Sequence, residues 1–177
     1  MNPAVRDSAI ETLTGWQPPD AGQDALRHAV LAFLLARPDS CRRSCEPGHI
    51  TASALVVDDI EGRTLLTLHP RLGRWVQLGG HCEDDDADIV AAALRVDPVL
   101  AAIHVHPVTC SLGVPTRHLD LQFIATAPPG AEAVISDESL DLRWFGVEAL
   151  PDGVDAGLLQ LVTAARCRWS SGFRSPE

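Results

Sequence analysis

The sequence predicts an α/β or α+β sandwich with a mixed sheet, preceded by a helical extension at the N-terminus. Three observations predict it: two helical segments come first, apolar strand-like segments then follow with helical segments among them, and turns rich in glycine and proline separate the elements. With 46% hydrophobic residues in a chain of 177, a core of ordinary domain size can form.

The N-terminal region predicts two helices, Pro3 to Trp16 and Ala21 to Arg37. Apolar residues recur in the second at the spacing of one helix face, namely Leu26, Val30, Phe33 and Leu34. Pro38 ends this helix because its ring cannot continue the hydrogen-bond pattern. We therefore expect residues 1–47 to form a helical extension.

The middle of the chain predicts a hairpin followed by a short strand and a helix. Ile50 to Val57 is an apolar, β-branched strand, and Thr64 to Leu68 returns after a turn rich in aspartate and glycine. Trp75 to Leu78 is a short strand that runs into Gly79 and Gly80. The alanine-rich segment from Ile89 to Leu94 then favours a helix.

Three further strands and a closing helix complete the predicted domain. The strands are Ala101 to Val108, Leu119 to Ala125 and Asp141 to Val147, and the helix is Val154 to Arg168. Residues 48–170 are expected to form this domain, and residues 171–177 a frayed tail.

Charge and composition exclude several classes of function. The formal net charge of −10 argues against coating nucleic acid and against adsorption to an anionic membrane. All basic residues are arginine, which excludes lysine Schiff-base chemistry. No apolar run reaches the roughly 18 residues of a membrane helix, so we expect a cytoplasmic protein. The five cysteines are odd in number and are expected to be reduced structural thiols.

One ordered set of short segments resembles a known family. Leu78 to Glu83 is similar to the glycine turn and first acidic residue that open a Nudix box, and Arg71 to Trp75 is similar to the basic, tryptophan-bearing entry to it. Later parts of the same pattern are found at Arg117 to Leu121, Glu138 to Phe145 and Val147 to Pro151. From His49 to Arg168 the chain therefore resembles the Nudix hydrolase family, which implies an α/β fold of the Nudix type, an α/β/α sandwich with a mixed sheet.

This resemblance implies a Nudix-type hydrolase that uses Mg²⁺ or Mn²⁺ to cleave a diphosphate linkage in a nucleoside diphosphate derivative, a small molecule. It implies metal oxygens from Glu83 and Asp86, an orienting role for Arg95 and assistance to the base by Glu138. Substrate contacts are implied at the following residues: Arg74, Trp75, Gly79 and Gly80. Nudix relatives are often dimers, so a homodimer is one of the oligomeric states that the sequence leaves open.

The second half of the box departs from the family pattern. After Arg95 the family has metal-binding glutamates, whereas this chain has Val96 to Leu100 with a helix-breaking Pro98. Three explanations remain. The first is a real deletion that leaves an inactive protein, and the second is that residues are missing between two printed neighbours. The third is an atypical site formed by Glu83, Asp84, Asp86 and Asp88. We expect a break, visible as a Cα separation above roughly 3.8 Å between Leu94 and Leu100. The alternative function is a catalytically inactive Nudix-fold protein that binds a nucleotide or protein partner.

Other candidate residues have structural interpretations beside the functional ones. His104, His106 and Cys110 lie close in sequence, as do His81 and Cys82, and such residues bind zinc in other proteins. Because the ligand sets look incomplete, solvent-facing histidines are the favoured interpretation. Other candidates have a plain structural alternative. The aspartates before Ile89 are alternatively a solvated helix start, and Glu138 is alternatively a turn residue. Trp75 and Trp144 are interpreted as core residues, with stacking on a base as the alternative.

Overall fold

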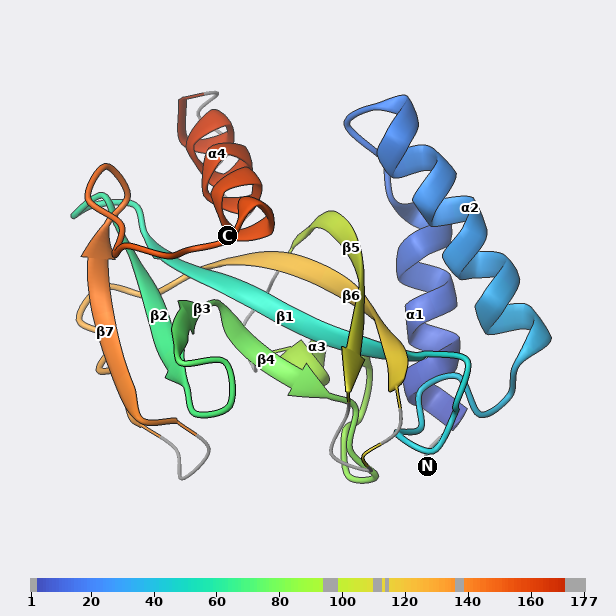
Figure 1. The fold of residues 1–177 in the computed structure, drawn as a ribbon. Helices are drawn as coiled ribbons and strands as arrows, with labels where there is room; N and C mark the ends of the chain where they lie inside the picture. The colour runs from blue at the N-terminus through green and yellow to red at the C-terminus, as the bar shows by residue number, and fades with distance from the viewer. Residues whose placement is uncertain (1–2, 94–98, 110–112, 114, 136–138, 171–177) are drawn as a thin grey trace. The chain divides into compact units, whose positions relative to one another are not determined.

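The computed structural model describes residues 3–93, 99–109, 113, 115–135 and 139–170, which form four helices and seven strands (Figure 1). The helices are α1 (Pro3–Gly15), α2 (Ala21–Ala36), α3 (Ile89–Ala93) and α4 (Ala156–Ser170). The strands are β1 (His49–Asp58), β2 (Arg63–His69), β3 (Arg74–Val76), β4 (Leu78–His81), β5 (Val99–Thr109), β6 (Pro115–Thr126) and β7 (Asp141–Gly146). Hydrogen bonds join the strands in a mixed sheet, which confirms the predicted α/β fold.

The chain divides into two compact units, the first being Met1–Ser53 with Gly79–Phe123. In this unit α1 and α2 lie side by side (Figure 1), and Arg6 Nε of α1 donates a 2.9 Å hydrogen bond to the carbonyl oxygen of Leu34 in α2. The side chain of Asp20 caps the start of α2 by accepting from the backbone N–H of Gln23. Both predicted N-terminal helices are therefore confirmed, to within one residue at their ends.

The strands of the first unit are arranged around the beginning of β1. Both β4 and β6 pair with β1, and β5 pairs with β6. Gly79 makes the approach of β4 possible: its φ is +129°, and a Cβ at this position would lie 2.3 Å from the carbonyl oxygen of Ala52. Only glycine tolerates that backbone conformation and that distance without a shift. Gln23 of α2 accepts from the N–H of Ile103 and donates to its carbonyl oxygen, which fixes α2 against β5.

The second unit consists of Ala54–Leu78 and Ile124–Glu177. Its centre is β2, which pairs antiparallel with the end of β1 in the predicted hairpin, with β3 and with β7. The expectation of a single strand from Trp75 to Leu78 is wrong. Two strands occupy this stretch, because the hydrogen-bonding partner changes within it: β3 pairs with β2, whereas β4 pairs with β1.

Each unit has its own buried apolar side chains. The largest in the first are Leu13, Leu34, Ile50, Ile89, Ile103, Leu121 and Phe123, and those in the second are Leu55, Leu66, Leu158 and Leu161. Within the described residues, none of the helices has both the length and the apolar character that crossing a membrane requires. Residues Leu94 to Pro98 lie outside the described residues, so the expected chain break there remains a prediction.

Candidate functional site

Polar side chains occupy one face of β1 in the first unit, where an apolar strand was expected. His49, Thr51 and Ser53 are 0%, 4% and 7% exposed. Because alternate residues of a strand point to the same side, the three share one face. Buried polar groups are destabilising unless they find partners, so this face requires matching groups on a neighbouring strand.

The matching groups come from β6, which pairs with β1. Asp120 is 6% exposed and accepts hydrogen bonds from Thr51 Oγ1 at 2.9 Å and from Ser53 Oγ at 2.7 Å. Gln122 adds a longer bond of 3.3 Å from its Nε2. The buried carboxylate thus has three donors within the protein, which is how a buried charge is made tolerable.

A cluster of imidazole rings lies at one end of this polar face. It consists of His49 at the start of β1, His81 at the end of β4 and His118 on β6. The ring centroids are 5.2 Å apart for His49 and His81, and 4.9 Å apart for each of these rings and His118. One ligand atom from each residue lies within 4.8 Å of the other two. We call these three residues the histidine cluster.

Two rings of the histidine cluster, those of His49 and His118, have lowered pKa values, which favours their neutral form. The pKa of His118 is lowered to about 3, first by burial and then by charge repulsion from the neighbouring rings of His81 and His49. Burial also lowers the pKa of His49. Neutral imidazole is the form that binds metals, since its unprotonated nitrogen carries the lone pair. Nε2 of His118 is buried and has no hydrogen-bond partner among the described residues.

The histidine cluster corrects one expectation and adds residues that the sequence analysis missed. His81 and His106 are not solvent-facing: both are only partly exposed, and both rings contact His118. His49 and His118 were not among the candidates. The signal that could have found them is the alternation of polar residues along β1 and β6. The sequence analysis instead treated the β1 segment as wholly apolar. Among the described residues, the ligand atoms of His49, His81 and His118 converge closely enough to hold one metal ion.

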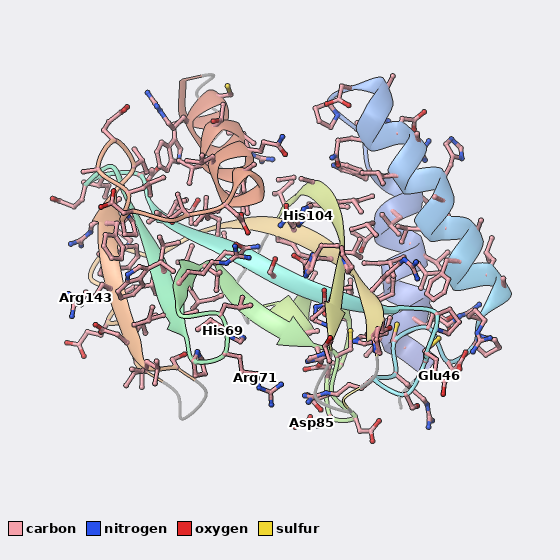
Figure 2. The ribbon with its side chains drawn as sticks, in the orientation of Figure 1. Glu46, His69, Arg71, Asp85, His104 and Arg143 are labelled. Carbon is pink, nitrogen blue, oxygen red and sulfur yellow. The ribbon has the colours of Figure 1, made fainter. Side chains whose placement is uncertain are left out.

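The predicted metal carboxylates Glu83 and Asp86 lie in the exposed loop after β4, where Figure 2 labels Asp85. The backbone N–H of Glu83 donates to Asp86 Oδ2 at 2.7 Å, so both residues belong to one turn. The carboxylate of Glu83 is ion-paired with Arg43. Further along, Asp88 caps α3 by accepting from the N–H of Ala91. The metal roles of Glu83 and Asp86 therefore stay predictions.

The predicted substrate-binding residues are divided between the two units. Gly79 and Gly80 lie in β4 of the first unit, whereas Arg74 and Trp75 lie in β3 of the second. Arg74 is ion-paired with Asp155 at 3.2 Å, and the ring of Trp75 packs against Phe145 with centroids 4.8 Å apart.

These contacts have structural roles, and the substrate roles stay predictions. The contact with Phe145 agrees with the core interpretation of Trp75. The predicted catalytic residues Arg95 and Glu138, and also Cys110, lie outside the described residues.

Comparison with known proteins gives similarity to solved structures alone. No family model matches the chain, and no curated protein matches it. A MutT Nudix hydrolase from Burkholderia pseudomallei is 21% identical, with 67% of this chain and 98% of that chain covered and a TM-score of 0.46. An Ap4A hydrolase from C. elegans is 18% identical, with 70% and 98% covered and a TM-score of 0.45. A UDP-X diphosphatase is 14% identical, with 96% and 93% covered and a TM-score of 0.46. At such identities and TM-scores, these similarities establish no activity for this chain.

Proposed function

We propose that this protein is a Nudix-type hydrolase that cleaves a diphosphate linkage in a nucleoside diphosphate derivative with the help of Mg²⁺ or Mn²⁺. The observation that supports it best is the order of strand, glycine and acidic turn around β4. Gly79 lets β4 approach β1 so closely that a Cβ would meet the backbone, and the chain passes from β4 directly into the loop of Glu83 and Asp86. This is the local arrangement that the resemblance implies for the start of a Nudix box.

In this proposal each residue has a defined task. Glu83 and Asp86 supply carboxylate oxygens to the metal, which when bound neutralises phosphate charge and activates water. Arg95 orients a phosphate and Glu138 assists the base, as the resemblance implies. The resemblance also implies substrate contacts at Gly79, Gly80, Arg74 and Trp75. An added Cβ would meet nothing within 4 Å at Gly80, whereas the backbone of β1 fills the space beside Gly79.

The substrate class follows from the same resemblance and from the charge of the chain. With a net charge of −10, the protein repels a polyanion such as nucleic acid, whereas a small diphosphate can bind through a metal cation. We therefore propose a small-molecule substrate and a cytoplasmic enzyme, with homodimer formation left to measurement.

Two observations favour a second candidate, a Nudix-fold protein that binds a nucleotide without turning it over. Arg43 already neutralises the carboxylate of Glu83, and the segment Val96-Asp97-Pro98 contains none of the family's glutamates. A metal held by so few carboxylates binds weakly, because Mg²⁺ gives up its water ligands reluctantly.

The two candidates are separated by a turnover assay on the full chain. Phosphate or nucleotide release is measured from a panel of nucleoside diphosphate derivatives, with Mg²⁺, with Mn²⁺ and with EDTA. The hydrolase predicts metal-dependent release that Glu83→Gln reduces and that the exposed neighbour Asp85→Asn leaves unchanged. Binding of a nucleotide without release above the buffer rate would support the non-catalytic protein instead.

A further inference from the structure

We propose that His49, His81 and His118 form a binding site for a divalent transition metal, and that Zn²⁺ is the ion it matches best. The site lies wholly within the first unit and uses none of the carboxylates assigned to Mg²⁺ above. It is therefore independent of the proposed hydrolase function and can be tested without any substrate.

The three ligands are carried by paired strands, which fixes their relative positions. His49 is the first residue of β1, and β1 pairs both with β4, which ends at His81, and with β6, which contains His118. The ligand atoms lie within 4.8 Å of one another. In a tetrahedral zinc site with Zn–N bonds of about 2.05 Å, the nitrogens are about 3.4 Å apart. Modest rotations of rings on rigid strands can close that difference.

The chemistry of the donors selects the class of metal. Imidazole nitrogen suits Zn²⁺, Co²⁺, Ni²⁺ and Cu²⁺, whereas Mg²⁺ takes oxygen ligands. The buried Nε2 of His118 has no hydrogen-bond partner among the described residues, and a buried polar atom of this kind is destabilising unless something binds it. A metal ion in the histidine cluster would supply the missing partner.

The charges around the histidine cluster permit a bound cation. Arg43 is a cation whose field reaches His49 and His118, but its guanidinium is ion-paired with Glu83, which offsets its charge. Asp120 lies two residues beyond His118 on the same face of β6 and carries a buried carboxylate. This negative charge reduces the cost of placing a dication beside a buried polar face.

Three protein ligands leave one position of a tetrahedral ion open. Zinc sites that are closed by four protein ligands are structural, whereas three ligands leave room for water or for an oxygen of a bound molecule. We infer that the fourth ligand here is water or an anionic oxygen such as that of a phosphate.

The first experiment measures metal binding by the full-length chain after removal of metals with a chelator. Titration with Zn²⁺ in a calorimeter should give one tight site per chain. Titration with Co²⁺ should give the visible d–d bands of a low-symmetry site without the near-ultraviolet band of a cobalt–thiolate bond. A thiolate band, or the absence of a one-to-one site, would overturn the proposal, since buried Cys41, Cys45 and Cys82 would be the competing ligands.

Variants identify the ligands. His81→Asn and His118→Asn are each expected to weaken Zn²⁺ binding by more than about 100-fold, since loss of a direct ligand exceeds the loss of its supporting hydrogen bond. The matched control is His28→Asn, an identical change at an exposed position of α2. Far-ultraviolet circular dichroism shows whether each metal-free variant is folded. If one of the two ligand variants does not fold, the other still tests the site. Equal Zn²⁺ affinity in folded His81→Asn, folded His118→Asn and His28→Asn would refute the site.

Discussion

Ser53 donates a 2.7 Å hydrogen bond from its Oγ to Oδ2 of the buried Asp120. The two residues lie on paired strands, β1 and β6, and Thr51 donates to the other carboxylate oxygen. A carboxylate in this position has been removed from water, so its hydrogen bonds decide whether its burial is tolerable. The stability of the first unit should therefore depend on this carboxylate.

Replacing the carboxylate should destabilise the fold. Asp120→Ala removes the carboxylate that accepts from the buried hydroxyls of Thr51 and Ser53, and we expect the free energy of unfolding to fall by about 3 kcal/mol. Asp120→Asn keeps one acceptor oxygen and should lower it by about 1 kcal/mol. Urea denaturation measures both. Asp85→Ala, at an exposed position, is the control and should change stability by less than about 0.5 kcal/mol. An Asp120→Ala protein as stable as the control would contradict the buried-carboxylate account.

The two glycines of β4 should differ sharply when each is replaced by alanine. Gly79→Ala places a Cβ 2.3 Å from the carbonyl oxygen of Ala52 at a φ of +129°, so we expect a loss of about 3 kcal/mol or more. At Gly80 nothing lies within 4 Å of an added Cβ, and alanine should change stability by less than about 1 kcal/mol. Thermal unfolding of the pair measures the difference. Similar losses in both variants would show that β4 does not approach β1 in this way.

The turn of the β1–β2 hairpin predicts a dependence on pH. The pKa of Asp58 lies below its usual 3.8, because its carboxylate accepts from the backbone N–H of Glu61 and also from Arg63, against the opposing effect of burial. A lowered pKa in the folded state gives stability that is present above the unfolded pKa and is lost as pH falls through the folded pKa.

This dependence can be isolated by substitution. Urea midpoints measured at neutral pH and at pH values below about 4 should fall less steeply for Asp58→Asn than for the unmodified chain. Asp59→Asn removes a neighbouring carboxylate that does not accept these turn hydrogen bonds, and it should keep the original pH profile. If Asp58→Asn and the unmodified chain lose stability in parallel, Asp58 is not responsible.

The sequence predicted the elements that depend on local patterns. The helices α1 and α2 and the β1–β2 hairpin follow from apolar periodicity, prolines and turn residues, and they lie within a residue or so of their expected bounds. The division of residues 74–81 into β3 and β4 could not be predicted in this way. It depends on a change of pairing partner, from β2 to β1, which involves residues far away in the sequence.

The candidate sites show the same limit. Glu83 and Asp86 could be named because they follow a short motif, whereas the histidine cluster combines single residues from three strands. The alternating pattern of His49, Thr51 and Ser53 did carry information, since period-two polarity indicates a polar strand face. Which histidines meet across the sheet depends on strand order and register, and those are not local properties.

The last prediction concerns the ion pair of Arg43 with Glu83. If Glu83 is a metal ligand, Arg43 competes with the metal for its carboxylate, and removing the guanidinium should strengthen Mg²⁺ binding. Because an exposed ion pair contributes about 0.2–1 kcal/mol, Arg43→Ala should lower the Mg²⁺ concentration for half-maximal turnover by no more than about fivefold. In the non-catalytic alternative, the same variant gains no turnover at any Mg²⁺ concentration.

The matched control for this prediction is Arg42→Ala, which removes the same charge from an exposed neighbouring position and keeps the ion pair. A general effect of charge on Mg²⁺ attraction would appear equally in both variants, whereas release of Glu83 would appear in Arg43→Ala alone. Combining Arg43→Ala with Glu83→Gln should abolish the gain, because the carboxylate set free by the first change is removed by the second. A gain that persists in the double variant would exclude Glu83 as the ligand and leave the metal to other oxygens of the loop.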